Sequence, residues 1–340
     1  MKKNLKEILT IEGLKIGFSS GKIERSLLPP FSAHAREGEL IAVIGRNGIG
    51  KSTLLKTLAG LQPALGGEIL YDGIKLKDHS RLDLAHKVGY LSTEIVKVSN
   101  LNVYDLVALG RFPHTNWVGK IDADSKKAIA EAIENTGMSV LSDRPVSELS
   151  DGERQRAMIA RILAQDTRIM IMDEPTAFLD IGSKFEILHL LHILSRKNGK
   201  TIIFSTHDLH LAISQSDKIW LIIGDRLIEG SPEDLMIEGA FDHLFDPASV
   251  KFNSENGIYT FIGENKGAIY IEGDGILKQW TVKAVKRSGY SVSESNTIPK
   301  LKVPLHNNEK WLLSTAKLSL EFSSLYELAG WLNREENLLT

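Results

Sequence analysis

The sequence predicts an α/β fold with a mainly parallel sheet, followed by a small second α/β domain. Short apolar runs bounded by turn residues alternate with longer segments of helical spacing, which is typical of buried parallel strands joined by crossover helices. A glycine-rich segment, residues 45–52, follows the first run and precedes a helical segment. The expected strands are residues 40–44, 169–172, 201–205 and 218–223.

Composition bounds the function classes. The chain has 340 residues, of which 42% are hydrophobic and 25% are charged, as in ordinary soluble proteins with a sizeable core. A net charge of -2 gives no reason to expect nucleic acid or an anionic membrane as partner. The absence of cysteine excludes disulfides, thiol catalysis and cysteine metal sites. No apolar run has the length of a signal peptide or a membrane span, so we expect a cytoplasmic-type protein that serves a membrane only through a partner.

The segment from about residue 95 to 165 has a helical pattern of apolar residues, unlike the mixed strand and helix patterns on either side of it. "VYDLVALGR", "DADSKKAIAEAIENTG" and "DGERQRAMIARILAQ" have helical spacing, and Gly137 is a plausible C-terminal cap. We therefore expect a helical subdomain inserted in an α/β domain of residues 1–262.

Residues 263–340 are expected to form a separate accessory domain. "GAIYIEGDG" indicates a strand and a turn, and "ILKQWTVKAVKRSG" a helix with Ile276, Trp280 and Ala284 on one face. β-prone pieces and a final helix, "SLYELAGWLN", follow. A second nucleotide site is not expected, because the turn lacks a Lys-Ser ending. The aromatic residues expected to build a core are Trp280, Trp311, Tyr326 and Trp331.

"GRNGIGKS" matches the phosphate-loop pattern G-x-x-x-x-G-K-[ST], between an expected strand and helix. Its glycines let backbone N–H groups surround phosphate, and the helix N-terminus adds partial positive charge. Lys51 would reach the β- and γ-phosphates, and Ser52 would ligate Mg²⁺. The alternative is a glycine-rich turn with a chance Lys-Ser. The expected nucleotide-binding residues are Gly45, Arg46, Asn47, Gly48, Ile49, Gly50, Lys51, Ser52 and Thr53.

Polar groups follow two of the expected strands. "IMIMDE" ends in Asp173, which suits the Mg²⁺ shell, and Glu174, which can act as general base on the attacking water. In "STHD", His207 could contact the γ-phosphate. Alone, an acidic pair is usually a solvated cap and a histidine usually structural. The phosphate loop favours the functional interpretation.

"LSDGE" predicts a second anion-binding turn. Ser150 or Asp151 can cap a helix that runs to about Gln165, so backbone N–H groups are presented at a helix N-terminus. The helical insert holds this turn away from its own phosphate loop. If two chains pair about a twofold axis, residues 150–153 of each (Ser150, Asp151, Gly152 and Glu153) complete the other's site.

With these motifs, residues 1 to about 262 resemble an ABC-transporter ATPase subunit. "GRNGIGKST" resembles its Walker A, "LSDGE" its signature, "IMIMDE" its Walker B, "TAFLD" with Asp180 its D-loop, and "STHD" its H-switch. Phe18 in "LKIGF" resembles the aromatic that stacks on adenine, the alternative being ordinary strand packing. "VYDLVALGRFPHTNW" with "IDADSKKAIAEAIENTGM" is similar to importers of iron–siderophore complexes, haem or cobalamin.

The resemblance implies an ATP-hydrolysing importer subunit. Two copies would close around two Mg-ATP molecules and drive a membrane permease, held at the cytoplasmic face of the plasma membrane and served by a substrate-binding protein. Lys51, Glu174 and His207 would be catalytic, and the permease would dock near residues 93–104. The alternatives are a soluble ABC ATPase of DNA repair or translation, which usually has tandem ATPase domains or a basic face, and a regulatory module without turnover.

The sequence departs from the family's pattern at three positions. Thr93 stands where a glutamine that touches Mg²⁺ is usual, and Asp151 and Glu153 replace the signature's glycine and glutamine. Asp151 is unfavourable near a triphosphate unless it points away. One hypothesis is that Glu94 takes over part of the glutamine's role, and the alternative is that Glu94 is a solvated loop charge.

Overall fold

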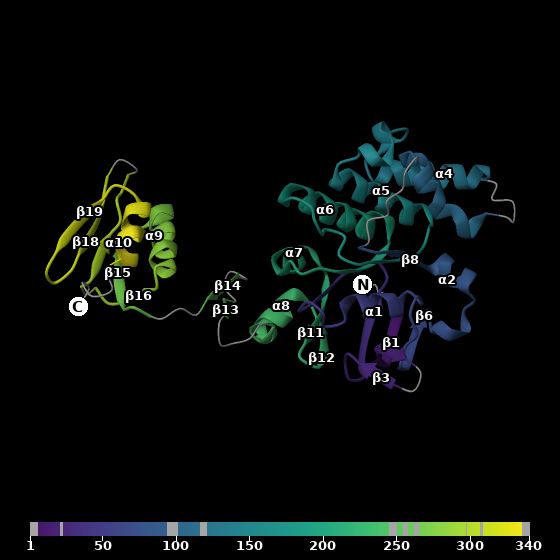
Figure 1. Ribbon diagram of the computed structural model, residues 1–340, viewed down its shortest axis with the longest axis horizontal. Coiled ribbons are helices and arrows are strands. Elements are labelled where there is room, and N and C mark those ends of the chain that lie inside the picture. Colours follow the sequence, from purple (N-terminus) through teal and green to yellow (C-terminus); the bar gives the residue numbers. More distant parts are fainter. Residues whose placement is uncertain are drawn as a thin grey trace, which may run out of the picture. The chain divides into compact units, whose positions relative to one another are not determined.

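The structure is a computed structural model whose chain divides into two compact units, described separately below (Figure 1). The first comprises Met1–Pro247 with Lys251–Thr260, and the second comprises Ala248–Val250 with Phe261–Thr340. The residues that the structure describes are 6–20, 23–93, 101–115, 121–244, 250–253, 258–261, 265–296, 298–306 and 309–334.

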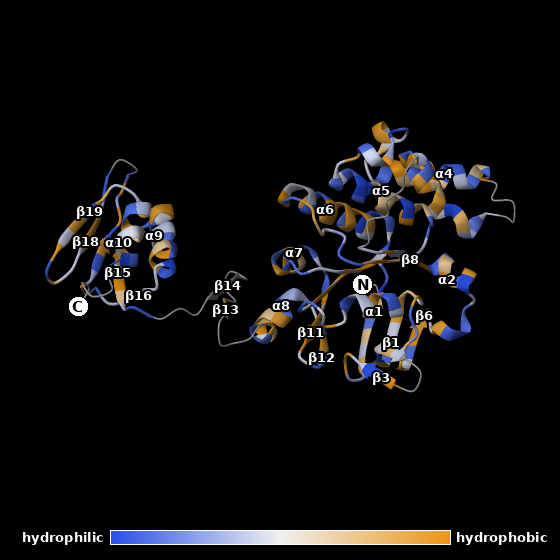
Figure 2. Ribbon diagram, in the orientation of Figure 1, coloured by the Kyte–Doolittle hydropathy of each residue, from blue (hydrophilic) through white to orange (hydrophobic). Residues whose placement is uncertain are grey.

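A six-stranded sheet forms the centre of the first unit, with strand order β12-β11-β5-β10-β9-β8. All neighbours are parallel except β11 and β12. Every residue of β5, β9 and β10 is buried, as expected for strands covered on both faces, and β11 is apolar along most of its length (Figure 2). The four predicted strands are thereby confirmed, together with the α/β class. The strands are β5 (Leu40–Gly45), β8 (Val88–Leu91), β9 (Ile169–Met172), β10 (Thr201–Ser205), β11 (Lys218–Ile223) and β12 (Arg226–Gly230).

Alternate residues along the strands of the central sheet pack into two hydrophobic cores, one on each face. Ile41, Val43 and Ile171 pack with Leu54 and its helix, α1 (Lys51–Leu58), in the core shared with an antiparallel sheet. That sheet has the order β4-β1-β6-β7, and a separate hairpin pairs β2 with β3. These strands are β1 (Glu7–Lys15), β2 (Gly17–Ser20), β3 (Ile23–Ser26), β4 (Phe31–Arg36), β6 (Gly66–Tyr71) and β7 (Ile74–Lys75).

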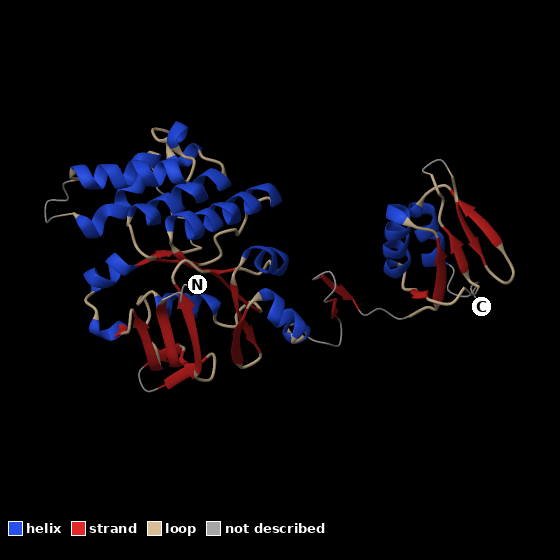
Figure 3. Cartoon of the chain, turned by 180° about the vertical axis from the view of Figure 1, so that it is seen from behind, coloured by secondary structure: helices blue, strands red, loops and turns tan. Residues whose placement is uncertain are grey.

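The other face of the central sheet carries most of the helices (Figures 1 and 3). Gly137 ends α4 as predicted: its φ is 69°, its N–H donates to Glu134 O, and the N–H of Met138 donates to Ile133 O. The helices are α2 (Arg81–Lys87), α3 (Val103–Ala108), α4 (Ala123–Asn135), α5 (Asp151–Ala164), α6 (Ile181–Asn198), α7 (Leu209–Gln215) and α8 (Pro232–Ile237). The 3₁₀ turns are η1 (Leu76–Asp78), η2 (Leu109–His114), η3 (Ser139–Leu141), η4 (Val146–Glu148) and η5 (Ala240–His243).

The second unit has its own five-stranded sheet and core, with strand order β16-β15-β17-β18-β19. Strand β15 is parallel to both neighbours, whereas β17, β18 and β19 are antiparallel. The elements are β15 (Ala268–Glu272), α9 (Gly275–Arg287), β16 (Ser291–Ser293), β17 (Lys300–Lys302), β18 (Trp311–Ser314), β19 (Ser319–Phe322) and α10 (Leu325–Arg334), and a separate pair, β13 (Val250–Asn253) and β14 (Ile258–Phe261), precedes them.

The expected aromatic core of this unit is correct only in part. Trp311 is buried and Trp331 packs against the core, with its ring centroid 6.1 Å from that of Phe322. The prediction is wrong for Trp280 and Tyr326, which are 54% and 86% exposed. Two other aromatic residues, Tyr290 and Phe322, belong to the core, together with aliphatic residues of the sheet and Val285, Leu328 and Leu332.

Candidate functional site

The phosphate-loop motif connects the C-terminal end of β5 to the N-terminus of α1. Gly50, the residue before α1, has φ of 113°, a conformation that L side chains rarely adopt. A Cβ on Gly45 would lie 2.9 Å from Ile49 Cγ2 and 3.0 Å from Ile222 O. Gly50, the N-cap of α1, makes no side-chain cap hydrogen bond, which leaves the first N–H groups of the helix available to an anion.

Lys51 is buried at the start of α1 and held over the loop. Its ammonium donates to Gly45 O at 2.8 Å and to Arg46 O at 3.3 Å. Burial lowers the pKa of Lys51, and the charges of Glu174 and Asp173 oppose that shift. The Lys51 ammonium therefore lies near the carbonyls of the loop and two carboxylates. A bound polyphosphate would give it a further anionic partner.

A hollow of about 950 Å³, counted with the solvent at its open mouth, brings the predicted residues of four motifs together. Phe18 is 54% exposed and lines this hollow, which does not fit the alternative that it packs inside the sheet. Its stacking role stays a prediction. The lining residues are Phe18, Leu27, Asn47, Gly48, Gly50, Lys51, Ser52, Thr53, Glu174 and His207.

Asp173 and Glu174 follow β9 directly, and hydrogen bonds from both neighbouring strands hold them. Asp173 is 5% exposed, its N–H donates to Leu91 O at 2.8 Å, and its Oδ1 accepts from Ser205 Oγ at 2.7 Å. Glu174 has φ of 48° and its N–H donates to Ser205 Oγ at 2.8 Å. His207 Nδ1 lies 3.7 Å from Glu174 Oε2. The charges of both carboxylates act on Lys51, and Glu174 also lies beside an imidazole.

These groups fit Mg²⁺ bound together with a nucleotide. In the described ranges, no group of three or more His, Cys, Asp or Glu side chains could cage a metal. Mg²⁺ does not need such a cage, since it is usually held by one or two carboxylates, waters and substrate phosphates. Ser52 and Asp173 supply a donor set of this kind.

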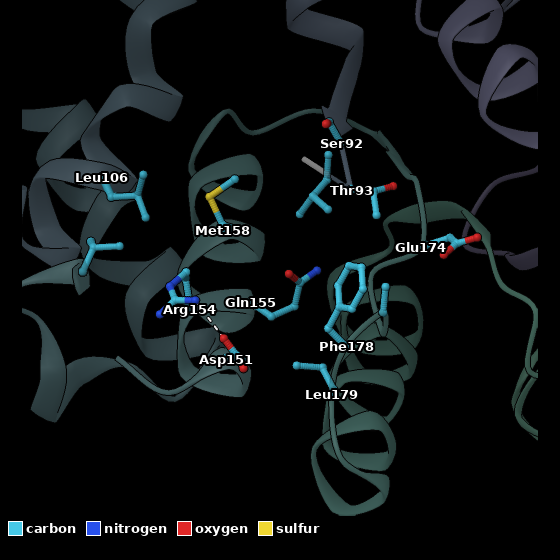
Figure 4. Close-up of a pocket in the computed structure, with 13 residues that line it drawn as sticks. Ser92, Thr93, Leu106, Asp151, Arg154, Gln155, Met158, Glu174, Phe178 and Leu179 are labelled. Carbon is cyan, nitrogen blue, oxygen red and sulfur yellow. Dashed lines mark hydrogen bonds and ion pairs between the residues drawn. The ribbon is translucent and has the colours of Figure 1, made fainter. Parts of the chain in front are cut away.

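The "LSDGE" turn lies at the start of α5, where Ser150 and not Asp151 is the N-cap. Ser150 and Glu153 form a reciprocal capping box, with Ser150 N–H donating to Glu153 Oε2 at 2.8 Å. Hydrogen bonds from the Ser150 N–H and hydroxyl lower the pKa of Glu153. The Asp151 carboxylate is paired with Arg154 at 2.8 Å, and Arg154 also donates to Leu149 O at 2.9 Å (Figure 4). Most of the negative charge at this turn is thereby bound locally.

A second hollow, of about 650 Å³ counted in the same way, lies beside the start of α5 (Figure 4). Thr93, Asp151 and Glu174 line it, and Glu174 lines both hollows. The phosphate-loop residues are not among its lining residues, which agrees with the expectation that the turn does not serve its own loop. Its other lining residues are Leu91, Ser92, Leu106, Val146, Arg154, Gln155, Met158, Ala177, Phe178 and Leu179.

Two other predicted positions have local roles. Asp180 is the N-cap of α6 and accepts from the N–H of Ser183 at 2.7 Å. Gly152 approaches the same residue, because a Cβ there would lie 3.0 Å from Ser183 Oγ. Glu94 and part of the expected permease-docking segment lie outside the described residues. Sequence reasoning missed Ser205, although a hydroxyl at a strand end before His207 was the available signal.

In the described part of the chain, no helix combines the length and the apolar character that crossing a membrane requires.

Comparison with known proteins identifies the family. Residues 28–177 match the family described as ABC transporter, and residues 266–333 match the Iron ABC transporter C-terminal domain. The achromobactin transport ATP-binding protein CbrD of Dickeya dadantii is 34% identical over 70% of this chain and 87% of its own length. The ferric enterobactin transport ATP-binding protein FepC of Escherichia coli is 34% identical over 69% and 85%.

A solved structure gives the same result. The protein cbiO1 from Clostridium perfringens, part of the ABC transporter complex cbiONQ, matches with a TM-score of 0.60 and 30% identity. The match covers 69% of this chain and 92% of that one. The chain therefore belongs to the family of ABC transporter ATP-binding proteins.

Proposed function

We propose that this chain is the ATP-hydrolysing subunit of an ABC importer that takes up an iron complex through a membrane permease. The observation that carries the ATPase assignment is the hollow in which Lys51, Ser52, Glu174 and His207 meet, with Asp173 directly beside Glu174. The cargo assignment is supported by the match to the Iron ABC transporter C-terminal domain and by relatives named for siderophore transport.

The chemistry follows from the positions of these groups. The backbone N–H groups of the loop and Lys51 bind the phosphates, since hydrolysis of a phosphoanhydride depends on positioning and on charge stabilisation. Ser52 and Asp173 would hold Mg²⁺, which would supply further charge neutralisation when bound. Glu174 takes a proton from the attacking water. His207, whose Nδ1 lies 3.7 Å from Glu174 Oε2, orients that water and the γ-phosphate.

Each site needs a second copy of the chain. The Ser150–Glu153 turn presents a helix N-terminus at the rim of a hollow that the phosphate loop does not line. In a twofold dimer, the turn of one copy would complete the nucleotide site of the other. Dimer closure on ATP and opening after hydrolysis would then move the permease, which holds the chain at the cytoplasmic face of the plasma membrane. A substrate-binding protein would deliver the cargo on the opposite side.

Phosphate release from Mg-ATP tests the ATPase function. We expect Lys51→Ala to reduce the rate by about a hundredfold, the usual effect of removing one charge-stabilising donor. Lys197→Ala, which changes an exposed lysine at the end of α6, is the matched control. A wild-type protein without ATPase activity, both alone and with the permease, would refute the proposal.

Uptake of radioactive iron bound to a siderophore tests the transport function. In a strain lacking the gene, the wild-type gene should restore uptake and Lys51→Ala should not. Equal restoration by both would show that ATP hydrolysis by this chain does not drive the uptake measured.

A further inference from the structure

The peptide unit that joins Asp173 to Glu174 is held at both ends by hydroxyl groups from two neighbouring strands. Its carbonyl, Asp173 O, accepts from Thr93 Oγ1 at 3.0 Å. Its N–H, that of Glu174, donates to Ser205 Oγ at 2.8 Å. The same Ser205 hydroxyl donates its hydrogen to Asp173 Oδ1 at 2.7 Å. One peptide plane, two carboxylate-bearing residues and two hydroxyls thus form a single arrangement.

Strand register brings these residues together. Met172 of β9 is paired with Leu91 of β8 on one side and with Phe204 of β10 on the other. The residue after Phe204 is Ser205, which therefore lies beside Asp173. Thr93 lies two residues beyond Leu91 and reaches the same peptide from the opposite strand.

Burial makes the serine contacts strong. Ser205 is 0% exposed and Asp173 is 5% exposed, so water does not compete freely for either. A hydrogen bond to a charged group contributes more than a neutral one, and a buried donor left without a partner carries the full desolvation penalty. Glu174 also has φ of 48°, which a residue other than glycine adopts only where its surroundings hold it.

We propose that Ser205 and Thr93 are positioning residues that lock this peptide and so aim both carboxylates. The inference rests on the proposed ATPase function. Ser205 fixes the backbone of Glu174 and the orientation of the Asp173 carboxylate, the group proposed to bind Mg²⁺. Thr93 fixes only the peptide carbonyl. A threonine at the position where the family usually has glutamine thus bonds the backbone between the two acids.

Removal of the Ser205 hydroxyl and removal of the Thr93 hydroxyl should have different kinetic effects. Ser205→Ala removes a bond to the Asp173 carboxylate and a partner of the Glu174 N–H, so kcat should fall by about ten- to a hundredfold. Thr93→Val removes one neutral bond, so kcat should fall by about fivefold. KM should change little for Thr93→Val, because this hydroxyl bonds only the peptide carbonyl, whereas KM for Mg-ATP should rise by up to about tenfold for Ser205→Ala, because the Asp173 carboxylate is released.

The response to Mg²⁺ separates positioning from general damage. Calorimetry with a non-hydrolysable ATP analogue measures binding without turnover, once with Mg²⁺ and once with EDTA. Ser205→Ala should weaken the Mg²⁺-dependent binding by about tenfold and leave the EDTA binding unchanged, since only the metal-side carboxylate is released. Thr93→Val should leave both unchanged.

Three further variants complete the experiment. Ser205→Thr and Thr93→Ser keep the hydroxyls and should restore most of kcat and of the Mg²⁺ response. Ser195→Ala removes a buried serine that donates to Gly38 O at 2.6 Å, so it controls for lost stability without a link to the site. Thermal unfolding of each variant shows which are folded.

The outcomes are distinguishable. A wild type that does not hydrolyse ATP refutes the proposed function. A wild type that does, with folded Ser205→Ala and Thr93→Val that match Ser195→Ala in kcat and in Mg²⁺ response, overturns the positioning role. Failure of Ser205→Thr and Thr93→Ser to restore activity, in folded protein, would overturn it as well.

Discussion

Glu174 is a lining residue of both hollows described above. Its φ of 48° lies in the left-handed region. Glu174→Gln keeps the size of the side chain and the backbone bond to Ser205, but removes the base. We expect Mg-ATP binding to persist and hydrolysis to slow by about 10²–10⁴, the range for a positioned general base. Calorimetry and phosphate release measure the two quantities, and an unchanged rate would assign the base elsewhere.

The same substitution also tests the shared site. Without turnover, closed dimers should accumulate, so light scattering should give a dimer with Mg-ATP and a monomer with EDTA. Lys51→Ala, which weakens phosphate binding, is the control and should stay monomeric. A Glu174→Gln protein that is monomeric under both conditions would argue against sites completed by a second copy.

At the scale of the element, the N-terminus of α5 depends on its capping box. Ser150→Ala removes the hydroxyl that accepts from Glu153 N–H, and such a loss costs about 1 kcal/mol. Urea unfolding measures it, with Ser139→Ala, an exposed serine of η3 whose hydroxyl caps nothing, as the control. Equal stability of the two variants would mean that the cap contributes nothing measurable.

The capping box also makes a pH prediction. Because the folded state lowers the pKa of Glu153, its ionised form stabilises folding at pH values above its ordinary pKa. This contribution is lost as the pH falls through the lowered pKa. The stability difference between wild type and Glu153→Gln should therefore shrink between about pH 7 and about pH 3. A difference that does not change with pH would contradict it.

Helix α9 shows how an element can be predicted while its orientation is not. Ile276, Trp280 and Ala284 share a face by spacing, yet Ile276 is 64% exposed and Trp280 is 54% exposed. Thr281 and Val285 face the core, and the Thr281 hydroxyl accepts from Trp311 Nε1 at 2.9 Å. The helix has two apolar stripes, and the indole N–H of β18 requires the one that carries an acceptor.

This orientation predicts unequal substitutions. Thr281→Val keeps the shape of the side chain but leaves the buried Trp311 N–H without its acceptor, so we expect a loss of about 1–3 kcal/mol. Trp280→Ala, on the exposed side, should cost no more than about 0.5 kcal/mol. Hydrogen exchange of peptides from α9 and β18 localises the effect. The reverse order of the two losses would show that the helix faces the other way.

At the scale of the molecule, the second unit has its own core, so it should be separable from the ATP site. We expect the domain limits 1–262 and 263–340. A chain ending at Ile262 should stay folded, bind Mg-ATP and hydrolyse it within about tenfold of the full-length rate, a change of ~1.4 kcal/mol in the barrier. Loss of nucleotide binding in a folded truncated chain would make the second unit part of the catalytic one.

The sequence by itself determined those features that depend on neighbours along the chain. The phosphate loop between β5 and α1, a helix cap at Ser150 or Asp151 and the end of α4 at Gly137 follow from local backbone conformation and from hydrogen bonds over a few residues, and the structure assigns the cap to Ser150. Only the tertiary structure decided which stripe of α9 is buried, and only strand register placed Ser205 and Thr93 on the peptide between Asp173 and Glu174. Those contacts join residues 31 and 80 positions apart, and their geometry depends on how strands pair, which no local pattern encodes.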